Sequence, residues 1–134
     1  MNVFDLTAIN DTLKEAVRST GASQNVYSSR PKANVKTADD FIVAKVSGQV
    51  TDRGAIGSCV CSFSLFAKDL QGGFVNEKKL SIMQRKLTEG LALNTGDLLF
   101  SDTPRVVADA PDDYGYTARI INFDTTIKAN FKTE

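Results

Sequence analysis

The hydrophobic positions near the N-terminus repeat with the period of an amphipathic helix. Apolar side chains recur every three or four residues, which places them on one helical face; they are Leu6, Ile9, Leu13, Ala16 and Val17. Asp5 is a suitable N-cap, and Gly21 can supply the left-handed residue that ends a helix. The pattern predicts a helix over about residues 5–19.

Two later segments alternate between apolar and polar side chains, as half-buried strands do. In residues 41–50 the apolar positions are Ile42, Ala44, Val46 and Val50. In residues 58–69 they are Cys59, Cys61, Phe63, Leu65 and Ala67. The turn residues Asp52, Gly54 and Gly57 separate the two segments. We therefore predict an antiparallel hairpin whose apolar face is covered by helices.

A second helix is predicted to follow Asn76, which is a suitable N-cap. Its apolar positions are spaced by three, four and four residues, as one buried helical face requires; they are Leu80, Met83, Leu87 and Leu91. Shorter apolar runs predict strands around residues 26–27, 98–100 and 105–109.

The longest strand-like stretch, residues 114–131, changes its alternation halfway. Apolar side chains occupy even positions up to Ile120 and odd positions from Ile121 onward. A bulge, burial on both faces, or packing of one half on a partner would each explain the change. At about 3.3 Å per residue the stretch would span on the order of 60 Å. We therefore expect a bend, or an arm over residues 121–134 that forms an intersubunit strand.

These elements predict a single α+β domain over residues 1–134, with two helices on one face of a mainly antiparallel sheet. The length of 134 residues, with 42% hydrophobic and 24% charged residues, is typical of one globular domain. The chain has 16 basic and 16 acidic residues. This balance argues against a large nucleic-acid surface, which needs clustered cations, and we predict no sequence-specific nucleic-acid partner.

The N-terminal segment carries charged residues where a secretory signal would be apolar. No run of the chain approaches the roughly 18 consecutive apolar residues that a membrane span needs. We therefore expect a protein that works in a cytoplasm and has no membrane partner.

The sequence offers little catalytic chemistry. It contains no histidine, the most common general base and a common metal ligand. Asp112 and Asp113 fit a hairpin turn. Cys59 and Cys61 fit two small buried side chains on one face of a strand. We predict no catalytic, cofactor-binding or metal-binding residues, no cofactor and no enzymatic activity.

The sequence does contain candidate residues for binding a partner protein or another subunit. A long polar connection contains Arg30, Lys32 and Lys36, and connections of this length are more often functional than inert. Its three cations could meet nucleic acid or an acidic partner surface. The late alternation adds three apolar residues that would face a neighbouring subunit if the strand forms an arm; they are Phe123, Ile127 and Phe131.

The order of several segments resembles the small tail-terminator and tail-completion proteins of long-tailed phages and prophages. The segments NVYSSRP, DFIVAKVSG, VCSFSLFAKD and DDYGYTARI carry the resemblance, with a Leu/Met-striped helix before the last, over roughly residues 26–123. The resemblance implies a structural ring subunit, commonly hexameric, that caps the head-proximal end of the tail tube and joins the head. It implies tail-tube and head-completion proteins as partners, assembly in the host cytoplasm and a final place in the virion.

Two alternatives stay open. The first is a small ligand-binding or enzymatic α+β domain with a pocket between sheet and helices, lined by residues such as Phe63, Leu65 and Tyr116. The second is a subunit of a secretion or injection device with the architecture of a phage tail.

Overall fold

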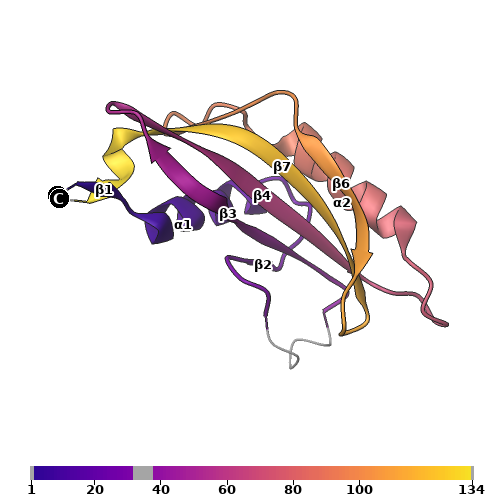
Figure 1. The fold of residues 1–134 in the computed structure, drawn as a ribbon. Helices are drawn as coiled ribbons and strands as arrows, with labels where there is room; N and C mark the ends of the chain where they lie inside the picture. Colours follow the sequence, from indigo (N-terminus) through magenta and orange to yellow (C-terminus); the bar gives the residue numbers. More distant parts are fainter. Residues whose placement is uncertain (1, 32–37, 134) are drawn as a thin grey trace.

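The computed structural model describes residues 2–31 and 38–133 as an α+β fold (Figure 1). The main sheet has six strands in the order β2-β3-β4-β7-β5, and β6 also pairs with β7. The strands are β2 (Val26–Tyr27), β3 (Asp40–Asp52), β4 (Ile56–Lys68), β5 (Leu98–Phe100), β6 (Arg105–Pro111) and β7 (Tyr116–Lys128). β2 runs parallel to β3, and the other neighbours are antiparallel. The predicted fold class is confirmed.

Both predicted helices are present and both are capped as their sequences suggested. In α1 (Leu6–Arg18) the Asp5 carboxylate accepts hydrogen bonds from the first-turn amides. In α2 (Glu77–Gly90) the Asn76 side chain accepts from the amide of Lys79 at 3.2 Å. Such caps satisfy amides that have no partner within the helix. The buried stripes of the two helices belong to one hydrophobic cluster, so both helices cover the same face of the sheet.

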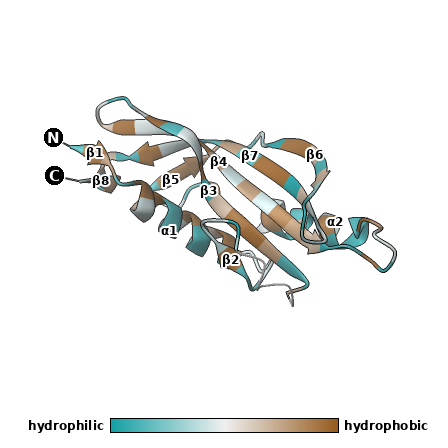
Figure 2. Cartoon of the chain, turned by 60° about the horizontal axis from the view of Figure 1, so that its bottom comes forward, coloured by the Kyte–Doolittle hydropathy of each residue, from teal (hydrophilic) through white to brown (hydrophobic). Residues whose placement is uncertain are grey.

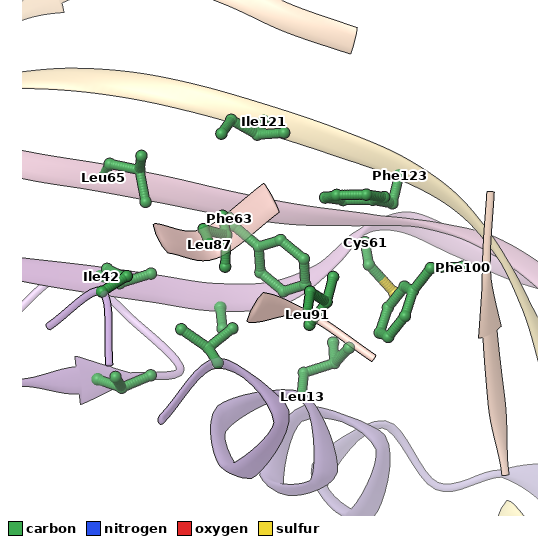
Figure 3. Packing of buried hydrophobic residues seen from close by; sticks show 14 of the residues in the cluster. Leu13, Ile42, Cys61, Phe63, Leu65, Leu87, Leu91, Phe100, Ile121 and Phe123 are labelled. Carbon is green, nitrogen blue, oxygen red and sulfur yellow. The ribbon is translucent and has the colours of Figure 1, made fainter. Parts of the chain in front are cut away.

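β3 and β4 form the predicted hairpin, and β4 supplies the centre of the core. Its odd-numbered side chains from Cys59 to Ala67 are all buried against the helices. Figure 3 shows Leu13 of α1 and Leu87 of α2 on the same side of the sheet as Phe63. A register shift between Ser47 and Thr51 interrupts the pairing near the hairpin turn.

The change of alternation in β7 comes from burial on both faces of the sheet. The pairing of β4 with β7 runs without a shift from Ile56↔Lys128 to Lys68↔Tyr116, so no bulge separates Ile120 from Ile121 on that side. Tyr116 belongs to a small cluster on the face opposite the helices. Ile121 and the later odd positions belong to the main core.

The expected arm over residues 121–134 is not formed by the described residues. β7 ends at Lys128, the short 3-10 helix η2 (Ala129–Phe131) turns the chain, and β8 (Lys132–Thr133) pairs with β1 (Val3–Phe4). The amide of Asp5 donates to the carbonyl of Phe131 at 2.8 Å. The segment therefore forms the expected bend rather than an arm. The odd side chains of β7 share a face with those of β4, where the domain's own helices bury them.

Candidate functional site

The face of the sheet opposite the helices is the candidate surface for association or binding. Within the described residues no helix covers it, and side chains from β3, β4 and β7 point outward there. Figure 2 shows apolar and polar bands alternating along these long strands. We call this surface the helix-free face, and its two ends differ in chemistry.

One end of the helix-free face is filled by aromatic side chains. The rings of Phe41 and Phe66 stack with centroids 4.4 Å apart. Tyr116 meets Phe41 edge-on at 5.2 Å, and Tyr27 lies against Phe41 at 6.1 Å. Offset-stacked and edge-on contacts of this kind are the favoured geometries for aromatic pairs. We call this group the aromatic end.

Arg30 lies across the aromatic end and is fully engaged there. Its guanidinium carbon is 4.8 Å from the Phe41 ring centre and 5.2 Å from that of Phe66. Two of its nitrogens donate to the Asp112 carboxylate at 2.8 and 3.2 Å, and a third donates to the carbonyl of Pro31 at 2.7 Å. Arg30 therefore has its partners within the domain, and its predicted contact with a partner surface stays a prediction. Arg30 joins the segment after β2 to the turn between β6 and β7.

The other predicted cations, Lys32 and Lys36, lie outside the described residues. The chain that leads out of this stretch is fixed by Tyr116, whose hydroxyl donates to the carbonyl of Ala38 at 2.6 Å. Burial of the phenol raises the pKa of Tyr116 above its ordinary value. Arg30 and Ala38 are thus both held against the β6–β7 hairpin.

The three apolar residues predicted to face a neighbour lie instead on or near the domain's own core. Phe123 is 2% exposed and Ile127 is fully buried. Phe131 is partly buried and packs against the same cluster. The positions of Phe123 and Ile127 opposite Cys61 and Gly57 account for their burial. Strand pairing, which the sequence pattern alone could not supply, was the missing signal.

The other end of the helix-free face contains a groove of about 890 Å³. Ser47, Val60 and Asp124 form one row across β3, β4 and β7. Thr126 and its partner Leu99 continue the surface onto β5. All five side chains line the groove. It is therefore a trough across four neighbouring strands, mixing hydroxyl and apolar groups.

The charged lining of the groove is acidic. Asp102 and Asp124 line it, and no lysine or arginine does. Arg105 donates to both carboxylate oxygens of Asp124 at 2.9 and 3.1 Å, and this hydrogen bonding holds the pKa of Asp124 below its ordinary value. Asp102 has no ion-pair partner in the part of the chain that the structure describes.

The cysteines lie on the inner side of the sheet next to the groove. Cys59 and Cys61 are both buried and unbonded, with their sulfur atoms 3.9 Å apart. Their burial as small side chains on one strand face is as predicted. The contact with Cys61, together with burial, raises the pKa of the Cys59 thiol. Burial therefore disfavours the thiolate of Cys59, which is the reactive form of a cysteine.

The sheet edge formed by β5 and β6 adjoins the groove and is the more exposed of the two edges. Every residue of β6 is exposed. The exposed large apolar side chains on this edge are Leu99, Val106 and Val107, with 50%, 51% and 43% of their surface accessible. The pairing places Leu99 and Val107 on the helix-free face and Val106 on the face that the helices cover. We call these three residues the apolar edge.

The pocket expected from the alternative hypothesis does not form where it was placed. Phe63 and Leu65 are fully buried among the helices, whereas Tyr116 belongs to the cluster on the opposite face. The three side chains therefore do not line a common cavity.

Among residues 2–31 and 38–133, no group of three or more His, Cys, Asp or Glu side chains is arranged to hold a metal ion. No helix in this part of the chain is long and apolar enough to cross a membrane. No protein-family model matches the chain, and no curated protein matches it in sequence.

Proposed function

We propose that this chain is a structural ring subunit that caps a phage tail tube and joins it to the head. The apolar edge is the observation that carries the proposal. Exposed apolar side chains along a sheet edge that the chain leaves uncovered favour association with another surface. The layout shared with tail-terminator proteins supports the more specific assignment to a tail.

The two edges of the sheet differ in cover, and the difference favours association through the edge at β6. The edge at β3 is occupied by the chain itself: β2 pairs with Ile42 and Val43, and the amide of Val46 donates to the Asn10 side chain at 3.0 Å. The edge at β6 has no such cover among the described residues. Exposed edges are normally blunted in proteins that stay monomeric.

The charged residues of β6 do not shield this edge, because they are turned toward the sheet. Arg105 binds Asp124, and Asp109 accepts two hydrogen bonds from Arg119 at 2.7 and 2.9 Å. A register shift between Val107 and Ala110 limits regular pairing with another strand. Side-chain packing against a neighbour is therefore favoured over strand addition.

Light scattering over a range of protein concentrations tests the proposal. We expect oligomers of ring size, commonly hexamers, with rings visible by negative-stain electron microscopy. Val106→Lys should lower the oligomer mass, because it places a charge on the apolar edge. Leu6→Lys is the matched control, since Leu6 is 48% exposed on α1. A wild-type monomer at every concentration would contradict the proposal.

Gene context tests the specific assignment. In the genome that encodes this chain we expect adjacent genes for tail-tube and head-completion proteins. The protein would then assemble in the host cytoplasm and remain in the virion. Neighbouring genes for a secretion or injection device would instead support a related ring in that machine.

The groove favours a second candidate, a small-ligand-binding domain. A volume of about 890 Å³ lies within the range of known ligand sites. This candidate predicts that a defined small molecule raises the melting temperature of the monomer. Val60→Trp, which fills the groove, should abolish that rise.

A further inference from the structure

Four aromatic rings surround the guanidinium of Arg30. The carbon at its centre lies 4.8 Å from the ring centre of Phe41, 5.2 Å from that of Phe66, 5.0 Å from that of Tyr114 and 5.5 Å from that of Tyr116. A cation is attracted to an aromatic face within about 6 Å of the ring centre, and groups of rings of this kind form binding sites for organic cations. The rings come from β3, β4, β7 and the turn before β7, so the fold itself assembles the site.

The Asp112 carboxylate completes the site and is held in place by its own turn. Its Oδ1 atom accepts hydrogen bonds from the amides of Tyr114 at 2.8 Å and Tyr116 at 3.1 Å. Its Oδ2 atom accepts from Nε and Nη2 of Arg30 at 3.2 and 2.8 Å. The backbone amides orient this carboxylate without help from Arg30, so Oδ2 stays directed at the cation between the rings. We call the four rings and this carboxylate the cation cage.

The chemistry of the cation cage selects a guanidinium group. The flat faces of a guanidinium stack on aromatic rings, while its N–H groups donate to a carboxylate. A quaternary ammonium ion is also attracted to the rings, but it has no N–H to donate to Asp112. A lysine ammonium can donate, but it is a compact, strongly hydrated charge that does not stack. The ligand that uses every part of the cage is therefore an arginine side chain.

Arg30 occupies the cage from a short segment at the edge of the sheet. It follows β2, a two-residue strand that forms one end of the strand order. The third hydrogen bond of its guanidinium goes to the carbonyl of the adjacent Pro31 at 2.7 Å. The side chain of Arg30 is 28% exposed and Tyr114 is 50% exposed, so the cage is not sealed from solvent. Withdrawal of Arg30 therefore breaks its contacts with the cage and leaves the long strands paired.

We propose that the cation cage is a binding site for an arginine side chain of another molecule, and that Arg30 is its built-in competitor. With Arg30 in place the site is closed. When Arg30 withdraws, the incoming guanidinium takes the same position between the rings and the same hydrogen bonds to Asp112. The cage contains no residue of the apolar edge, and the inference does not depend on ring assembly.

Titration with methylguanidinium, followed by NMR shifts of the Tyr114 and Tyr116 amides, tests the site. Arg30→Ala empties the cage and should bind the probe saturably, at concentrations well below those that unfold the protein. Wild type should bind at least tenfold more weakly, because apparent affinity falls with the fraction of molecules whose site is free. Arg30→Lys should lie between the two. Arg85→Ala, which removes an exposed arginine of α2, is the matched control and should behave like wild type.

Two further measurements separate the cage from general effects of the probe. Tetramethylammonium should bind Arg30→Ala more weakly than methylguanidinium does, because it cannot donate to Asp112. Adding Asp112→Asn to Arg30→Ala should weaken methylguanidinium binding at least tenfold.

Cooperative unfolding by urea establishes that each variant is folded, and if Arg30→Ala is not, the comparison of Arg30→Lys with wild type decides. Absence of saturable binding to the folded variants would overturn the inference. Equal affinity of wild type and the Arg30 variants would do the same, and so would binding that the loss of the Asp112 carboxylate leaves unchanged.

Discussion

The two ends of the helix-free face are built on the same strands, yet one is closed by the chain itself and the other is open. At the aromatic end, Arg30 and the neighbouring hairpin cover Phe41 and Phe66. At the groove end, Ser47 and Ser58 occupy outward positions on the same two strands. The difference lies in the size and polarity of the outward side chains rather than in the sheet.

Each solution has a physical reason. Large rings have a large apolar area, so a chain segment that crosses over them is stabilised by burying it. A guanidinium also stacks well on aromatic faces. Small hydroxyl side chains stay hydrated without cover, so they leave a hollow. The closed end therefore serves stability, and the open end is available to a partner.

The largest expected effect comes from opening the closed end. Phe41 is fully buried, and Phe41→Ala should cost about 3–5 kcal/mol of unfolding free energy, because a large buried ring leaves a cavity. Val60→Ala in the groove is the matched control and should cost less than about 1.5 kcal/mol, since it removes little buried area. Urea denaturation measures both. Equal losses would show that the two ends are equally packed.

Removing the cover from the aromatic end should have a smaller effect. Arg30→Ala takes away contacts to the rings and leaves the Asp112 carboxylate, 18% exposed, without its cation. We expect a loss of about 1–3 kcal/mol in unfolding free energy. Arg30→Lys should recover part of it, because lysine keeps the charge but lacks the planar fork. Arg85→Ala, at an exposed position of α2, should change nothing measurable. Identical results for Arg30→Ala and Arg85→Ala would refute the covering role.

The aromatic end should also respond to alkaline pH. Burial raises the pKa of Tyr116, so the folded protein holds this proton more tightly than the unfolded chain does. Above pH about 10 the unfolded phenol loses its proton first, and the free energy of unfolding should fall as pH rises toward the folded pKa. In Tyr116→Phe the free energy of unfolding should fall less steeply with pH, because the titrating phenol is gone. At neutral pH it should cost about 1 kcal/mol through the lost hydrogen bond. If the free energy of unfolding of Tyr116→Phe depended on pH between 9 and 11 as steeply as that of the wild type, Tyr116 would not be the group responsible.

The elements of the fold were predictable because each has a recognisable pattern in its own stretch of sequence. The stripe from Ile9 to Val17, the Asn76 cap and the alternation from Cys59 to Ala67 each depend on nearby residues only, and all three were confirmed. The class of the fold followed from their order.

The candidate surfaces were not predictable, because they depend on pairing between distant segments. Phe123 looked available until its place opposite Cys61 was known. Arg30 looked free because its partner Asp112 is 82 residues away. The groove draws on four strands. Each of these depends on contacts that no local pattern encodes.

The smallest expected effect on stability belongs to the open end. Leu99 is 50% exposed at the groove, and Leu99→Ser should change the unfolding free energy by less than about 1 kcal/mol. The adjacent Leu98 points to the core and is 1% exposed, so Leu98→Ser should cost at least about 3 kcal/mol, because it removes buried apolar volume and buries a hydroxyl. Urea denaturation of the two variants compares neighbouring positions on one strand. If Leu99→Ser proved as costly as Leu98→Ser, the groove would be a packed part of the domain and could not receive a partner.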